Sequence, residues 1–129
     1  MNKILVEVSV GELLDKISIL EIKKERIKDS EKLKFINDEH GILKDQLDQN
    51  VKSDNKLNSL FQSLKEINAK LWVIEDDKRL CEKDKDFTEK FIKLSRDVHF
   101  LNDDRAKLKL QINELTGSVI KEIKEYQSY

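Results

Sequence analysis

Residues 57–81, LNSLFQSLKEINAKLWVIEDDKRLC, and residues 87–115, FTEKFIKLSRDVHFLNDDRAKLKLQINEL, decide the fold of this chain. In both stretches, apolar residues recur at steps of three and four, which is the spacing of one face of an α-helix. The rows are Leu57, Leu60, Leu64, Ile67, Leu71, Ile74 and Cys81, then Phe87, Phe91, Leu94, Val98, Leu101, Leu108, Ile112 and Leu115. They predict a long antiparallel helical hairpin over residues 57–115 with packing like that of a coiled coil.

The turn of this hairpin fixes its register. Asp86 and Glu89 have the spacing of a capping box, so the second helix is predicted to start at Phe87. Facing residues then have numbers that sum to about 170. A second row on the later helix predicts a second neighbour, either residues 10–50 or another subunit. That row consists of Ile92, Arg96, His99, Asp103, Ala106 and Leu110.

Residues 10–50 are predicted to form a shorter helical hairpin. Ser9 and Glu12 form a capping box, which starts the first helix at Val10. Apolar residues lie on nearly all sides of this helix, so we expect it to be buried against several neighbours or at a subunit interface. A phase change in the apolar row predicts a break near residues 28–30. The second helix presents Leu33, Ile36, His40, Leu43 and Leu47, and Asp54 is the expected N-cap of the helix that follows.

The two ends of the chain are less regular. Residues 3–8, KILVEV, alternate in polarity and predict either a short strand or an extended arm. A strand needs a partner, which would be the C-terminal stretch or the same strand of a second subunit. Gly117 is the expected end of the long hairpin, and residues 118–126 are a short helix or the missing strand. The expected fold is therefore an all-α antiparallel bundle in one domain, residues 1–129.

Composition narrows the class of protein. The chain has 25 basic and 26 acidic residues with the signs interspersed, which argues against a nucleic-acid binder. Its apolar runs are too short to span a bilayer. The single cysteine, Cys81, lies on an apolar row and is expected to be buried and inert, and one unpaired cysteine is typical of a reducing compartment. We therefore expect a cytoplasmic protein.

A polar row runs beside the apolar face of the first long helix and faces two polar residues of the second. Together they predict one cluster: Asn68, Trp72, Glu75, Asn102 and Arg105. Because Arg105 interrupts an apolar row, its burial requires a carboxylate partner or an anionic ligand. The cluster is therefore either a structural network, with Glu75 or Glu66 pairing with Arg105, or a pocket in which Arg105 holds a phosphorylated or sugar-like ligand against Trp72.

Other chemistry has weaker support. His40 and His99 lie on different helices without the spacing of a metal site, and His99 with Asp103 is read as a hydrogen-bonded pair. Glu12 and Asp15 have the E-x-x-D spacing of carboxylates that hold Mg²⁺ in helical nucleotide pyrophosphatases, but no clear second pair stands on a neighbouring helix. We therefore predict no metal and no cofactor, and the sequence identifies no catalytic residues.

Five stretches of this chain resemble a bacterial family of small helical proteins of uncharacterised function. They are VSVGELLDKISILEIK at 8–23, LWVIED at 71–76, FIKLSRDV at 91–98, NDDRA at 102–106 and INELTGS at 112–118. Members of that family are sometimes encoded near glycosyltransferase modules or joined to them. The resemblance implies a shared role for Glu12, Asp15, Lys16, Trp72, Glu75, Asp76, Asn102, Asp103 and Arg105. Relatives tend to have Ile-Arg where this chain has Asp77-Lys78-Arg79, and they have a Tyr at the position of His99.

Two hypotheses follow. In the first, the chain is a non-catalytic interaction or accessory protein, a homodimer that serves surface-glycan synthesis, where the glycan role is implied by the resemblance alone. In the second, it is a small enzyme or binding protein for an anionic metabolite, such as a nucleotide sugar, and the site is the five-residue cluster around Arg105.

Overall fold

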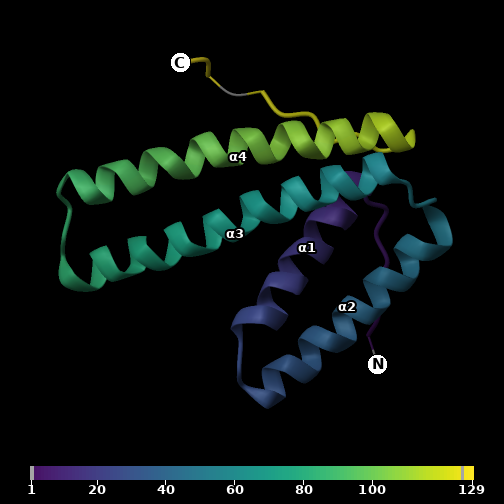
Figure 1. Ribbon diagram of the computed structural model, residues 1–129, viewed down its shortest axis with the longest axis horizontal. Coiled ribbons are helices and arrows are strands. Elements are labelled where there is room, and N and C mark those ends of the chain that lie inside the picture. The colour runs from purple at the N-terminus through teal and green to yellow at the C-terminus, as the bar shows by residue number, and fades with distance from the viewer. Residues whose placement is uncertain (1, 126) are drawn as a thin grey trace.

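The computed structural model describes residues 2–125 and 127–129, and within them the fold is a bundle of four α-helices (Figure 1). The helices are α1 (Val10–Arg26), α2 (Ser30–Asn50), α3 (Asn55–Asp84) and α4 (Glu89–Thr116). The predicted all-α fold, with one long and one shorter hairpin, is confirmed. None of these helices is long and apolar enough to cross a membrane.

The long hairpin of α3 and α4 has the predicted direction and register. Asp54 caps α3 by accepting a hydrogen bond from the Leu57 amide, and Lys85 ends the helix in the left-handed conformation, with φ of 53°. Across the hairpin, the Lys78 ammonium lies 5.7 Å from the centroid of the Phe91 ring. This contact places Lys78, a charged residue between Ile74 and Cys81 of the apolar row, against an aromatic face, where a cation is stabilised by the ring electrons.

The predicted start of α4 was wrong by two residues. The helix begins at Glu89, with Thr88 in the N-cap position. The reason is local, because the Asp86 carboxylate does not cap the helix. It accepts hydrogen bonds from the backbone amide and the hydroxyl of Thr88, 3.1 and 2.5 Å away, and so stabilises a turn before the helix.

Helix α1 lies at the centre of the bundle and packs against α2, α3 and α4. Its start is the predicted one, since the Ser9 hydroxyl accepts a hydrogen bond from the Glu12 amide. The break before α2 falls at residues 27–29, as expected. The core cluster joins α1, α3 and α4 and consists of Leu14, Leu57, Leu64 and Ile112. The apolar circumference of α1 is thus covered within one chain.

The two ends of the chain contain no strand in the part that the structure describes. Residues 2–9 form an extended arm before α1, which is the second of the two predicted alternatives. Gly117 ends α4 with φ of 64°, as predicted. Residues 118–125 form neither the helix nor the strand that was expected, and Tyr126 lies outside the described residues.

The C-terminal tail also supplies the second neighbour of α4. It turns back at Ser118 and runs along the helix (Figure 1), where the Tyr129 hydroxyl donates a hydrogen bond to Asp103. Asp103, Ala106 and Leu110 of the second row therefore face the tail. Of the two neighbours expected for this row, residues 10–50 do not fill that place, because α1 contacts α4 on the side that carries Arg105 and Lys109. The alternative of another subunit stays a prediction.

Candidate functional site

A buried polar site is centred on Asp15, whose side chain is 2% exposed. Arg105, from α4, donates two hydrogen bonds to this carboxylate: Nε to Oδ1 at 2.9 Å and Nη2 to Oδ2 at 2.5 Å. This is the two-point geometry in which a guanidinium binds a carboxylate most strongly. It ties the first helix to the last.

Helix α3 contributes to the same site through Asn68. Its Nδ2 atom donates to Asp15 Oδ1 and lies within hydrogen-bonding distance of Ser18 Oγ, both at 2.8 Å. The Ser18 hydroxyl donates in turn to the backbone carbonyl of Asp15, 2.7 Å away. Three helices therefore meet at one carboxylate, and each of its oxygens has a donor.

These contacts set the ionisation of the pair. Burial opposes the charge on Asp15, but the hydrogen bonds from Arg105 and Asn68 outweigh it, and the pKa of the carboxyl is below its ordinary value. The same hydrogen bond raises the pKa of Arg105. Asp15 is therefore charged at neutral pH and accepts hydrogen bonds without donating one.

A second ion group lies one turn further along α4. The Lys109 ammonium, on a side chain that is 8% exposed, donates to Glu12 of α1 at 2.6 Å and to Glu122 of the tail at 2.9 Å. Burial alone would lower the pKa of Lys109, but the two carboxylates reverse this effect and raise it. Glu122 responds in the opposite direction, with a pKa lowered chiefly by its hydrogen bond with Lys109.

The end of α4 also caps the start of α1. The Asn113 side-chain oxygen accepts a hydrogen bond from the Gly11 amide at 2.7 Å, and the Ser118 hydroxyl accepts one from the Val10 amide at 3.1 Å. A β-carbon on Gly11 would lie 2.6 Å from the backbone oxygen of Lys109, so a glycine is required for this close approach.

The structure brings together three of the five residues of the predicted cluster. Asn68 and Arg105 meet at Asp15, and Asn102 Oδ1 lies 3.4 Å from Arg105 Nη1. The other two make no hydrogen bond or ion pair to this group in the described chain: Trp72 is half-buried, and Glu75 is exposed. The carboxylate that pairs with Arg105 is Asp15, and the prediction of Glu66 or Glu75 for that role was wrong.

Sequence reasoning left Asp15 out of the cluster because it treated the long hairpin by itself. A signal for its inclusion was present, since one row of α1 runs at steps of four, three and four through Gly11, Asp15, Ser18 and Ile22. All four are buried. A buried row that begins with a glycine and contains a carboxylate predicts a close neighbouring helix that carries a cation.

The other candidate groups are engaged in local contacts. The predicted His99–Asp103 pair is not among the contacts of the described chain: the ring of His99 lies 5.3 Å from that of Tyr129, whose hydroxyl donates to Asp103. His40 lies 3.1 Å from the Lys24 ammonium. No group of three or more metal-binding side chains occurs among the described residues. Glu12 and Asp15, the E-x-x-D pair, each bind a cationic side chain.

The site is closed by its own partners. Within the described residues, every buried side-chain nitrogen and oxygen has a hydrogen-bond partner. Arg105 retains some access to solvent, with a side chain that is 30% exposed, but its charge is compensated by Asp15. This arrangement holds three helices together, and within it Asp15 is paired with Arg105, and Lys109 with Glu12 and Glu122.

Comparison with known proteins finds a family that matches nearly the whole chain. A family of unknown function, DUF6165, matches residues 4–129. The chain belongs to this family. No curated protein and no solved structure matches it. In this DUF6165 member, the matched range includes all of α1, α2, α3 and α4. It therefore contains both ion groups of the site.

Proposed function

We propose that this DUF6165 protein is a non-catalytic accessory protein that binds another protein through the free end of its long hairpin. Two observations support this proposal. The charges of the polar site are paired with one another, whereas apolar side chains on the long hairpin are exposed to solvent. In Figure 1 the turn end of α3 and α4 extends past α1 and α2. Between residues 72 and 108, Cys81 is the one buried residue.

The exposed apolar residues of this free end are the observation that carries the proposal. Val73, Leu80 and Ile92 are 43 to 54% exposed. A groove of about 630 Å³ lies between α3 and α4 beside Arg26 of α1, and Val73 is one of its lining residues. Its apolar lining is Ala69, Val73, Ile74, Phe100 and Leu101, and its charged lining is Arg26, Lys70 and Asp97. An apolar groove with a polar rim is the usual anatomy of a protein-binding surface.

The class of partner is inferred from the resemblance to a family whose members are sometimes encoded near glycosyltransferase modules or joined to them, and we propose that the chain serves surface-glycan synthesis. The buried, unpaired Cys81 favours a reducing compartment, and we place the protein in the cytoplasm. We also propose a homodimer. The apolar circumference of α1 no longer supports it, but the extended arm of residues 2–9 does.

The test is binding to a partner of the proposed class, a glycosyltransferase, measured with purified proteins. A Val73→Asp and Leu80→Asp double variant should weaken binding at least tenfold, because two charges would be buried without partners. Ile42→Asp, at an exposed apolar position on α2, is the control and should bind like the wild type. Equal binding by all three proteins would contradict the proposed surface.

A second candidate function is the binding of an anionic metabolite at Arg105. One observation favours it: Arg105 Nη1 is held by Asn102 at 3.4 Å alone, and the side chain is partly exposed. A thermal-shift screen of nucleotides, nucleotide sugars and sugar phosphates tests this candidate. A stabilisation of the wild type that is lost in Arg105→Met would favour it, whereas no shift with any of these ligands would argue against it.

A further inference from the structure

An apolar cavity of about 190 Å³ opens where α1, α2 and α3 diverge. Helix α2 packs along α1 and along no other helix of the described chain, so the side between α2 and α3 is left open. The apolar lining comes from all three helices and their connection: Leu14, Ile17, Leu47, Val51, Leu57 and Phe61. This cavity is separate from the polar site and from the free end of the hairpin.

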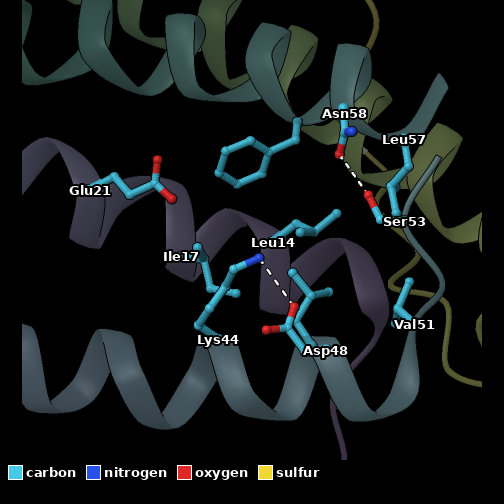
Figure 2. A pocket seen from close by; sticks show the side chains of 11 residues that line it. Leu14, Ile17, Glu21, Lys44, Asp48, Val51, Ser53, Leu57 and Asn58 are labelled. Carbon is cyan, nitrogen blue, oxygen red and sulfur yellow. Dashed lines mark hydrogen bonds and ion pairs between the residues drawn. The ribbon is translucent and has the colours of Figure 1, made fainter. Parts of the chain in front are cut away.

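The rim of the cavity is polar and carries both signs of charge. Figure 2 shows Lys44 and Asp48 on α2, paired at 3.2 Å, opposite Asn58 of α3, which accepts a hydrogen bond from Ser53. Glu21 lies at the α1 side. An occupant must therefore have an apolar body, and charges of both signs on that occupant would find partners at the rim.

The arm that precedes α1 has this composition. Ile4, Leu5 and Val6 are 73 to 85% exposed in the structure. In an extended chain, Ile4 and Val6 lie on one side, while Lys3 and Glu7 lie on the other with Leu5. Transfer of such exposed aliphatic side chains from water into an apolar cavity lowers their free energy.

We propose that the arm of one copy docks in the cavity of a second copy, with Ile4 and Val6 inside it. An apolar cavity of roughly 150 Å³ holds a group the size of benzene, so about 190 Å³ suits one or two aliphatic side chains. This inference rests on the homodimer of the proposed function. It adds the surfaces that form that dimer.

The arm of the same chain does not fill the cavity. Ser9 is buried, its carbonyl accepts a hydrogen bond from Leu13, and its hydroxyl caps Glu12, so the direction in which the chain leaves α1 is fixed. The arm stays exposed even though the cavity begins at Leu14, one turn into the helix. A second copy supplies an arm that is free of this restraint.

Charge and symmetry support the same occupant. Lys3 and Glu7 flank the aliphatic residues. The rim presents Asp48 for the lysine and Lys44 for the glutamate, two exposed side chains that pair with each other in the single chain. Long side chains reach a rim while the neighbouring apolar residues stay buried. Exchange of two arms is reciprocal, so both cavities of a twofold dimer are filled and the assembly closes.

The first experiment measures mass by light scattering at micromolar concentration. The wild type should have twice the chain mass of 15.2 kDa, and the Ile4→Asp and Val6→Asp double variant should have the mass of one chain. Leu5→Asp, on the opposite side of the arm, is the matched control and should stay dimeric. All three positions are exposed, so the fold of the chain is retained.

The second experiment locates the arm by disulfide formation in a Cys81→Ser background. Chains carrying Val6→Cys are mixed with chains of a different tag length carrying Asn58→Cys, and oxidation should link the two species. Lys93→Cys, on the free end of the hairpin, replaces Asn58→Cys as the control. Its yield should be several-fold lower.

The outcomes separate the two proposals. Two results overturn the arm inference and leave the homodimer in place. One is a dimer that survives Ile4→Asp and Val6→Asp. The other is a disulfide yield between Val6→Cys and Asn58→Cys that is no higher than the yield between Val6→Cys and Lys93→Cys. A wild type of single-chain mass overturns both. Loss of the dimer with Leu5→Asp as much as with Ile4→Asp and Val6→Asp overturns the docked orientation.

Discussion

Arg105 on α4 binds both carboxylate oxygens of Asp15 on α1, although 90 residues separate them in the chain. Asn68 of α3 donates to the same carboxylate, so one buried group fixes the relative positions of three helices. A buried charge of this kind is costly unless it is fully paired, which makes the arrangement specific for one packing of the bundle.

Loss of Arg105 alone should destabilise the protein. In Arg105→Met the buried Asp15 loses its cation, and we expect the free energy of unfolding to fall by about 2–4 kcal/mol in urea denaturation. The Asp15→Leu and Arg105→Met double variant should recover much of this loss, because neither charge remains. Arg79→Met, at an exposed position, is the control and should change stability by less than about 0.5 kcal/mol. Equal losses in the single and double variants would contradict a pairing role.

The same pair predicts the acid sensitivity of the fold. The pKa of Asp15 is lower in the folded state than in the unfolded state, so the unfolded chain takes up its proton first as the pH falls. The contribution of Asp15 is therefore complete above about pH 4 and is lost as the pH falls through the folded pKa. Urea midpoints measured between neutral pH and pH 3 should fall steeply in the wild type. The double variant should show a shallower dependence, and parallel curves would contradict the assignment.

Substitution of alanine for two glycines in helices should change the stability of the protein in opposite directions. A β-carbon at Gly11 would lie 2.6 Å from the Lys109 carbonyl oxygen and 2.9 Å from Asn113 Oδ1, so Gly11→Ala must move α1 away from α4. We expect a loss of about 1–3 kcal/mol. Gly41 has nothing within 4 Å of the same position and lies inside α2, so Gly41→Ala should stabilise by about 0.5–1 kcal/mol. Thermal unfolding of the two variants checks both signs.

Much of this fold was predictable because its signals are local. The apolar period predicted the helices, and the caps at Ser9, Asp54 and Gly117 were predicted correctly because each depends on a few neighbouring residues. The start of α4 was not predicted correctly. Asp86 can either cap a helix that begins at Phe87 or accept hydrogen bonds from Thr88 in a turn, and the turn forms.

The polar site was only partly predictable, because its pairs join helices that are not consecutive. The register of a hairpin follows from its turn, and it placed Asn68 near Asn102 and Arg105. No turn sets the register of α1 against α4, so the pairing of Asp15 with Arg105 had no local signal. The row from Gly11 to Ile22 marks a close contact but does not say with which helix.

The free end of the hairpin should open before the rest of the protein unfolds. Cys81 is its one buried residue between positions 72 and 108, and neither α1 nor α2 extends over that end in Figure 1. A thiol reagent should therefore label Cys81 through local opening, with a free energy several kcal/mol below that of global unfolding. In a Cys81→Ser chain, Leu64→Cys lies in the core cluster and is the matched control, which should react through global unfolding. The same labelling free energy at both positions would show that the hairpin and the core unfold as one unit.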